Sequence, residues 1–568
     1  MSESAGAWLR WMAVAAGLCA LLMLPVAWDA AQGWIFPDGV SYLDMAGGAV
    51  HDSPAVLLKN AYWSPGYPAI LALTMAVFRP SLAGELRAVY VVQWLIFLVA
   101  TACFSLLLST LLQWLRRNSW PELARDGRLC KALVCFGYVF FLLSNMNRTL
   151  WYTTPDMLLQ GLVYLSAACG LRLFLPDSEW KHSAALGLTL GAGYLAKAAM
   201  FPAALMLIAI LILKPPRDRL GRRHAAIALA CFCLTAAPLV LSLSYQKHRF
   251  TFGDSGKLNY AWFVNGIPPY AGWTGQPAES GTPAHAPRKL RESPLVLDFR
   301  TPVSGTLPIW YDPSYWWEGV RAPVSVRRQW MALFRPFKQV HSRETIVLVL
   351  AAALAPLCLL SFRVRQAIRG GGSQAWILIG WPVAVCLMHS LLLFTYRFVI
   401  GYLVLACLGM VTLFLRPFQA ATRTRALFAA ALLLALAGTA RFRPILQAAL
   451  HPDNGGPLMR EEDRDNGPSS AAVARELARL GIRPGDEIGA LGHSLDCYYA
   501  RLAGVRIVAQ IWEDPDRIQG LSALEVGQVL TLLRQIGVKA LVSRSKPGFV
   551  NDAGWIAVPR TDVYVRML

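Results

Sequence analysis

Four ionisable residues stand beside long apolar stretches, where charged side chains are rare. They are Asp38 in "WIFPDGVSYLDMA", Asp156 in "TTPDMLLQG", Lys197 in "GYLAKAAMF" and Arg397 in "LLLFTYRFVIGY". One such residue has a simple explanation, because Lys and Arg can reach lipid headgroups along their stems and Asp can cap a helix. Four of them in four separate segments favour a shared functional site, since ionisable groups next to hydrocarbon are costly.

These residue types suit the transfer of a sugar from a lipid phosphate. When the sugar leaves, the lipid phosphate gains a second negative charge. Lys197 and Arg397 would bind that charge more tightly in the transition state than in the substrate, and this difference accelerates the step. Asp38 would accept the proton of the attacking hydroxyl as a general base.

The segment around Asp38 predicts how the base is positioned. A helix of about ten residues can begin at "DGVSYLDMAGG", and a helix N-terminus favours the ionised carboxylate. Tyr42 falls on the same face, four residues later, and we expect it to contact substrate. Asp44 lies about 240° around the helix from Asp38, so it ranks second as a base.

The composition excludes an ordinary soluble protein. The chain has 568 residues, of which 55% are hydrophobic and 15% charged, and its mean hydropathy is +0.42. Several apolar runs reach the roughly 20 residues that cross a bilayer. The net charge of +20 lies largely in short loops, which is typical of cytoplasmic loops and does not indicate nucleic-acid binding. The 11 cysteines show no metal-ligand spacing, so we expect neither a disulfide nor a zinc site.

Loop charges predict a polytopic α-helical membrane protein with about 11 crossings, its N-terminus inside and its C-terminus outside. Basic loops that are expected inside lie at 116–131, 214–223, 363–369 and 416–425. Apolar runs lie near residues 8–28, 87–114, 131–149, 156–174, 183–198, 199–214, 224–245, 344–363, 374–395, 398–415 and 426–445. The run at 64–78 is too short to cross, and we expect it to lie along the outer face.

Two long loops face outward in this topology, at 29–86 and 246–343. Between the short runs that follow residue 183, a turn near "YLAKAAMFP" would bring Lys197 to the outer face. The loop 246–343 is dense in aromatic residues, which either stack on sugars or mark the membrane interface. Asp312 and Glu318 flank its "YWW" and are candidates for holding an acceptor, with a solvated loop as the alternative.

The chain divides into a transmembrane domain, 1–445, and a small α/β domain outside the membrane, 457–568. "SSAAVARELARLGI" and "LEVGQVLTLLRQIG" predict helices, whereas "DEIGALG", "VRIVAQI" and "VKALVSR" predict short strands. The segment has no glycine-rich nucleotide motif, and "GALGHS" is interpreted as a tight turn between a strand and a helix.

The motifs resemble those of the GT-C superfamily of integral-membrane glycosyltransferases, in the branch of protein O-mannosyltransferases and the lipid A aminoarabinose transferase. The resemblance covers roughly residues 8 to 415. It rests on "PDGVSYLDMA", "YWSPGYPAIL", "TTPDMLL", "GAGYLAKAA" and "TYRFVIGY", whose order and sidedness are specific together although each motif is loose.

The resemblance implies residue roles that add to the derivation above. Asp38 would be the catalytic acid of the first loop, and Asp156 the acid of the second loop, which orients substrate or a cation. Lys197 and Arg397 would contact the lipid phosphate, and Tyr396 beside Arg397 would contact substrate. The first loop has no DxD sequence, so no metal ligand is assigned and a divalent cation stays an open alternative.

The resemblance also implies an inverting transferase in the bacterial inner membrane, acting on its outer face. Its partners would be a polyprenyl-phosphate sugar, membrane lipid, and an acceptor that is a lipid, a polysaccharide or a protein. A transporter or flippase of polyprenyl-linked sugars is the competing interpretation, because it would share the cations but needs no base. Transporters often contain internal repeats, and the sequence has none.

Overall fold

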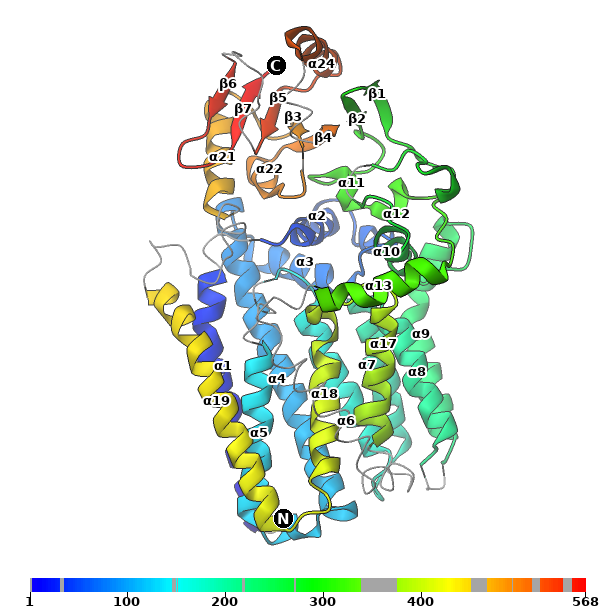
Figure 1. Cartoon of the computed structure of the whole chain (residues 1–568), viewed down its shortest axis with the longest axis vertical. Coiled ribbons are helices and arrows are strands. Elements are labelled where there is room, and N and C mark those ends of the chain that lie inside the picture. The colour runs from blue at the N-terminus through cyan, green and yellow to red at the C-terminus, as the bar shows by residue number, and fades with distance from the viewer. Residues whose placement is uncertain are drawn as a thin grey trace.

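The chain forms a tall helical bundle that carries a smaller layer with a β-sheet at one end (Figure 1). The N-terminus lies at the opposite end of the bundle from this layer. The computed structural model describes residues 3–30, 35–145, 150, 152–216, 220–269, 272–338, 375–450, 467–492, 494–512, 522–544 and 554–568.

Five described helices are long and apolar enough to cross a membrane. They are α4 (Glu85–Asn118), α5 (Gly127–Asn145), α9 (Arg223–Gln246), α18 (Tyr396–Phe414) and residues 420–439 of α19 (Ala420–Leu450). Other described helices of the bundle are α1 (Glu3–Ala30), α6 (Asp156–Arg172), α7 (Trp180–Ala196), α8 (Met200–Leu213) and α17 (Trp381–Ser390). The count of about 11 crossings stays a prediction, and the run at 344–363 lies outside the described residues.

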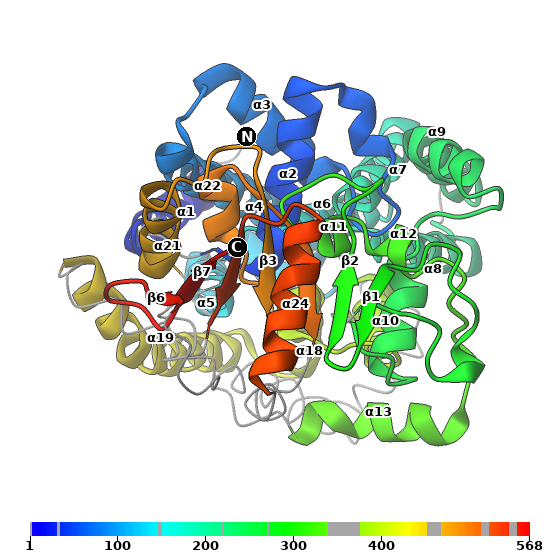
Figure 2. The ribbon, with the colours of Figure 1, turned by 90° about the horizontal axis from the view of Figure 1, so that it is seen from above.

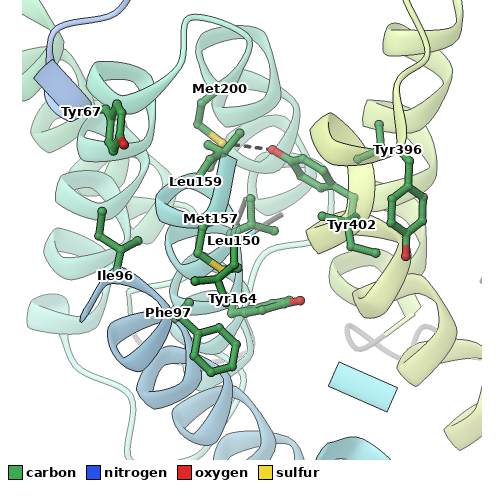
Figure 3. Packing of buried hydrophobic residues seen from close by; sticks show 14 of the residues in the cluster. Tyr67, Ile96, Phe97, Leu150, Met157, Leu159, Tyr164, Met200, Tyr396 and Tyr402 are labelled. Atoms are coloured by element: carbon green, nitrogen blue, oxygen red, sulfur yellow. Dashed lines mark hydrogen bonds between the residues drawn. The ribbon is translucent and has the colours of Figure 1, made fainter. Parts of the chain in front are cut away.

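Close helix packing in the bundle depends on small residues. At Gly161 in α6, an added Cβ would lie 3.0 Å from the Cα of Ala100 in α4. Small residues at such crossings let two backbones approach each other closely within a membrane. Figure 3 shows larger side chains packing between the helices, and the hydroxyl of Tyr402 in α18 donates a hydrogen bond to the sulfur of Met200 at 3.2 Å.

Two helices lie between the bundle and the sheet layer, as Figure 1 shows. They are α2 (Pro37–His51) and α3 (Gly66–Phe78), and α3 covers the short run that was predicted to lie along the outer face. The exposed side chains of Leu73, Val77 and Phe78 give α3 an apolar surface. The helix predicted at "DGVSYLDMAGG" is confirmed as α2, which begins with a proline at its first position.

The helical conformation is interrupted between α7 and α8, in the region where two short crossings were predicted. Lys197 ends α7 in an extended conformation, with φ −156° and ψ 126°, and α8 begins at Met200. The break places Lys197 outside the regular backbone pattern of both helices, so its side chain can turn toward neighbouring segments.

The sheet has seven strands in the order β1-β2-β4-β3-β5-β7-β6. The three predicted C-terminal strands are confirmed as β3 (Glu487–Leu491), β4 (Arg506–Trp512) and β5 (Ala540–Ser543), which pair in parallel. Strands β6 (Trp555–Ala557) and β7 (Tyr564–Met567), which the sequence analysis missed, extend one edge. The predicted helices are confirmed as α21 (Gly467–Arg479) and α24 (Ala523–Gln535), and α24 lies across the sheet in Figure 2.

The long outer segment is more ordered than a loop. It supplies the hairpin β1 (Arg288–Glu292) and β2 (Leu295–Asp298), and β2 pairs antiparallel with β4 at the other edge of the sheet. The sheet therefore takes two strands from outside the predicted range 457–568. The same segment forms helices α10 (Ser255–Phe263), α11 (Pro308–Tyr311), α12 (Pro313–Trp316) and α13 (Val326–Lys338).

Six described aromatic residues of this segment are buried, namely Trp262, Trp273, Phe299, Trp310, Trp316 and Trp317. The expectation that the aromatic residues stack on sugars or mark the interface stays a prediction. Trp262, Trp310 and Trp317 are 3%, 6% and 1% exposed. The centre of the Trp262 ring lies 5.9 Å from that of Trp310 and 5.3 Å from that of Trp317. Burial of these large rings joins the segment to the main apolar core, which also includes the bundle helices.

Candidate active site

Asp38 stands at the second residue of α2, where the helix meets the top of the bundle. Its Oδ2 accepts a hydrogen bond from Nη2 of Arg397 at 3.0 Å, and both side chains are 14% exposed. Arg397 is the second residue of α18, so two helix starts from distant parts of the chain face each other. The acid and the cation that were predicted separately are direct partners.

Arg397 also approaches the second acid. Its Nη1 lies 3.5 Å from Oδ2 of Asp156, whose side chain is fully buried at the start of α6. The hydroxyl of Thr154 donates a hydrogen bond to the same Oδ2 at 2.8 Å. Arg397 therefore bridges a carboxylate on α2 and a carboxylate on α6.

Lys197 completes the network from the break between α7 and α8. Its Nζ forms an ion pair and hydrogen bond with Oδ1 of Asp156, and its side chain is 21% exposed. The Nζ also lies 3.6 Å from the centre of the Phe398 ring. The structure thus brings together all four ionisable residues that the sequence singled out, whereas their catalytic roles stay predictions.

Three aromatic rings surround the guanidinium of Arg397, and the sequence analysis missed all of them as site residues. The centres of Phe36, Tyr152 and Phe398 lie 4.3, 5.2 and 4.9 Å from Cζ of Arg397. Rings at this distance attract a cation and shield it from water. The sequence held a signal for two of these rings. Phe36 and Tyr152 each stand within four residues of the aspartate of a Pro-Asp pair, on its N-terminal side.

Burial raises the pKa of Asp38, and the adjacent Arg397 opposes that rise. A carboxylate that is held in a dry site takes up a proton more readily than one in water. The position therefore suits a general base, whose pKa needs to lie closer to the working pH than that of a free aspartate.

Tyr42 lies beside this network, as its predicted position on the helix face requires. It is 5% exposed, and its ring packs edge-on against Trp63 and Tyr67 with centroids 5.1 and 5.4 Å apart. Burial raises the pKa of the Tyr42 hydroxyl, and the carboxylate of Asp38 raises it further. The hydroxyl is therefore a neutral group close to the base.

The other predicted substrate contacts have protein partners. Tyr396 is 4% exposed, and its hydroxyl lies 3.4 Å from the carbonyl oxygen of Ser144. Asp312 caps α12 by accepting from the amide of Tyr315, and Glu318 pairs with Lys247 at 2.9 Å. Neither acid is in a solvated loop, and their proposed role in holding an acceptor stays a prediction.

Asp44, the second-ranked base, faces a different set of groups. It accepts hydrogen bonds from Nη1 of Arg501 at 2.6 Å, from the Thr306 amide at 2.7 Å and from the Thr306 hydroxyl at 2.9 Å. Arg501 in α22 (Tyr498–Ala503) also forms hydrogen bonds with Glu85 at the start of α4. No sequence pattern links the members of this second cluster, because they are far apart in the chain.

Two nearby carboxylates raise the question of whether the site fits a divalent cation. Arg397 bridges Asp38 and Asp156, and Lys197 pairs with Asp156, so both acids already have cationic partners. In the part of the chain that the structure describes, no three His, Cys, Asp or Glu side chains are grouped to hold a metal. This donor set fits an anionic ligand better than a divalent cation, which needs carboxylates free of such partners.

One donor in the network forms an ion pair but no hydrogen bond, because Nη1 of Arg397 lies 3.5 Å from Oδ2 of Asp156. Among the described residues, Nη1 of Arg397 has no hydrogen-bond partner although it is buried. A buried donor without an acceptor is rare and costly, and it indicates a place where a ligand oxygen can bind. An anionic oxygen between Arg397 and Lys197 would satisfy it.

Solved structures share this architecture. ArnT from Cupriavidus metallidurans in its apo state aligns with a TM-score of 0.50 over 99% of this chain and 98% of its own, at 14% identity. The oligosaccharyltransferase of Archaeoglobus fulgidus in complex with Zn and sulfate aligns with a TM-score of 0.51 over 94% and 68%, at 12% identity. ArnT bound to undecaprenyl phosphate aligns at 0.48 over 98% of each chain, at 13% identity.

No family model and no curated protein matches the sequence. At identities of 12 to 14%, the likeness to the solved structures concerns the fold. It confirms the predicted resemblance to the GT-C glycosyltransferases at that level.

Proposed function

We propose that the chain is an inverting glycosyltransferase that moves a sugar from a polyprenyl-phosphate donor to an acceptor outside the cytoplasm. The observation that carries the proposal is Nη1 of Arg397, which pairs with Asp156 at 3.5 Å but makes no hydrogen bond among the described residues. Lys197, the second cation, pairs with the same Asp156. A phosphate oxygen fits this donor because guanidinium groups bind phosphate through two parallel N–H groups. The shared fold supports a lipid-linked substrate.

Donor binding would prepare the base. The charges of the two cations and the two carboxylates in the network sum to zero. The phosphodiester of the sugar donor would therefore add a negative charge that has no partner yet. Arg397 would exchange Asp38 for the phosphate, and Asp38 would lose the cation that lowers its pKa. Its free oxygen could then take the proton of the acceptor hydroxyl as that hydroxyl attacks the sugar.

The leaving group would depend on both cations. The bond from the sugar to the phosphate oxygen breaks as the acceptor bond forms, and the lipid monophosphate keeps the electron pair. Lys197 and Arg397 would stabilise the second negative charge on that phosphate, each by about 1.5–3 kcal/mol. Asp156 would hold both cations in place, because it contacts both.

The location of the reaction follows from the predicted topology. The network lies at the end of the bundle that faces the sheet layer, which the charge pattern assigns to the extracytoplasmic side of a bacterial inner membrane. A thiol reagent that does not cross membranes should label Arg321→Cys in intact cells and label Arg223→Cys only after lysis. The reverse pattern would place the network on the wrong side.

Loss of the gene tests the activity whichever sugar is transferred. Cells without the protein should accumulate a polyprenyl-phosphate sugar and lack that sugar on a lipid or surface glycan, as measured by mass spectrometry. Wild-type protein and Arg223→Gln should restore the glycan, whereas Asp38→Asn should not. A flippase needs no base, so restoration by Asp38→Asn would reject the transferase in favour of transport.

A further inference from the structure

A small basic cavity lies at the end of the bundle opposite to the sheet layer, far from the candidate active site. It has a volume of about 130 Å³ and lies among α1, the end of α4 and the start of α5. Arg116, Arg125 and Lys131 contribute its cations, and Leu112 and Val134 are among its apolar lining. None of its described lining residues is acidic.

The cations of this cavity are not engaged by the acids nearby. Among the described residues, no carboxylate lies within 4.0 Å of the charged nitrogens of Arg116, Arg125 or Lys131. The neighbouring acids have other partners: Glu122 pairs with Arg423 at 3.2 Å, Asp126 accepts from two backbone amides at the start of α5, and Asp177 pairs with Arg117 at 3.1 Å. Three positive charges therefore meet around one small cavity without compensation.

An exposed tryptophan indicates at which level of the membrane the cavity lies. Trp11 of α1 is 50% exposed and lines the cavity, and Nζ of Lys131 lies 4.8 Å from the centre of its ring. Tryptophan rings of membrane proteins gather at the level of the lipid headgroups. We therefore expect the cavity to open at the level of the lipid headgroups.

We propose that this cavity binds the phosphate of an anionic phospholipid of the cytoplasmic leaflet. The cavity has room for more than one water-sized group, and a phosphate group is of that size class. Basic pockets between transmembrane helices on the cytoplasmic side are suited to anionic headgroups. The site is independent of the proposed transferase, because none of its residues contacts the network around Arg397.

Binding can be measured on the purified full-length protein by native mass spectrometry. Dioleoyl phosphatidylglycerol should remain bound, whereas dioleoyl phosphatidylcholine, which has no net charge, should be lost. Arg116→Gln, Arg125→Gln and Lys131→Gln should each weaken phosphatidylglycerol binding about fivefold, and the triple variant should abolish the bound species. These side chains reach the surface, so the variants should fold.

A matched control removes one positive charge elsewhere on the same end of the bundle. Arg223→Gln, at the start of α9, should change phosphatidylglycerol binding less than twofold. Asp38→Asn should also leave it unchanged, so failure of the proposed transferase would not affect this test. Phosphatidylglycerol should raise the melting temperature of the wild type and of both controls, but not that of the triple variant.

Four results would overturn the proposal. Equal retention of the two phospholipids would mean that charge does not select the ligand. Unchanged binding in the triple variant would place the lipid elsewhere. Inorganic phosphate that displaces phosphatidylglycerol at equal concentration would make this a site for free anions. Displacement by undecaprenyl phosphate at equal concentration would assign the cavity to a carrier lipid.

Discussion

Helix α2 takes part in two clusters in which one arginine bridges two carboxylates, and the clusters differ in their other members and in their hydrogen bonding. On one face, Arg397 links Asp38 of α2 to Asp156 of α6. On another face, Arg501 links Asp44 of α2 to Glu85 of α4. Each cluster joins α2 to a bundle helix through one guanidinium and two carboxylates.

The clusters differ in how fully their hydrogen bonds are made. Arg501 uses Nε and Nη2 on Glu85 and Nη1 on Asp44, with distances of 2.5 to 2.9 Å, and Asp44 also accepts two bonds from Thr306. Arg397 makes one hydrogen bond to Asp38 and leaves Nη1 without one in the described chain. Among the described residues, aromatic rings, and not further hydrogen-bond acceptors, surround the guanidinium of Arg397.

This difference separates a cluster that holds the fold from one that can bind. A saturated buried ion cluster is strongly destabilised by loss of one member, because the remaining charges are left uncompensated. A cluster with a donor that makes no hydrogen bond can exchange a protein partner for a ligand at lower cost. We therefore expect Asp44 to contribute to stability and Asp38 to act in the proposed reaction.

The largest expected effect is on the rate of transfer in Asp38→Asn. The variant keeps the size of the side chain but cannot take the proton, so transfer should fall about 10²- to 10⁴-fold. The melting temperature should change little. Asp44→Asn should show the reverse, with a lower melting temperature and most of the transfer rate. If Asp38→Asn kept activity within a few-fold of wild type, Asp156 would become the candidate base.

Next in size is the loss of stability in Arg501→Ala. The substitution leaves Asp44 and Glu85 facing each other without a cation, which should lower the free energy of unfolding by about 3–5 kcal/mol. Thermal unfolding in detergent measures the change. Lys181→Ala is the control, because its pair with Glu179 lies at the surface, with side chains 60% and 55% exposed, so its melting temperature should hardly shift. Equal shifts in the two variants would remove the distinction between the clusters.

Arg397→Ala should act on catalysis more than on folding. Loss of one charge-assisted contact to the phosphate should lower kcat/KM about 10- to 100-fold. Lys197 still compensates Asp156 in this variant, so the melting temperature should fall less than in Arg501→Ala. Arg397→Lys should recover part of the activity. Wild-type kcat/KM in Arg397→Ala would assign this residue to packing alone.

The smallest effect concerns Asp312, a carboxylate that has no arginine partner among the described residues. Burial raises its pKa to about 6, above the roughly 3.9 of an unfolded chain. Its contribution to stability is therefore complete below about pH 3.9 and is lost as the pH rises through about 6. Asp312→Asn keeps the helix cap. Between about pH 4 and 7, its free energy of unfolding should rise by about 2 kcal/mol relative to that of the wild type. Parallel pH profiles of unfolding in the two proteins would contradict this.

The sequence predicted the separation of Asp38 from Asp44 because it depends only on helix geometry. Six residues turn a helix by about 240°, so the two acids could not share a partner on one face. The Pro-Asp pairs likewise placed Asp38 and Asp156 at helix starts. Helix geometry and helix-start patterns were sufficient to predict features that depend on one turn or one helix.

Long-range partners could not be predicted. Asp44 and Arg501 are separated by 457 positions, and no local pattern links them. The tryptophans of the outer segment would look the same in sequence whether they contacted sugar, lipid or one another. Strand β2 was missed because "LVLD" is short and its partner β4 lies more than 200 residues later.

The pairing of β2 with β4 has a consequence for biogenesis. Helices α17, α18 and α19 lie between these two strands in the chain, so the ribosome must complete and the membrane must accept them before the sheet can close. Until β4 is made, strand β2 of the hairpin has an unpaired edge. A C-terminal fragment made alone would likewise expose an edge on β4, whose five central residues are all buried in the complete sheet. Synthesis and insertion of this protein are thus coupled from residue 288 to its end.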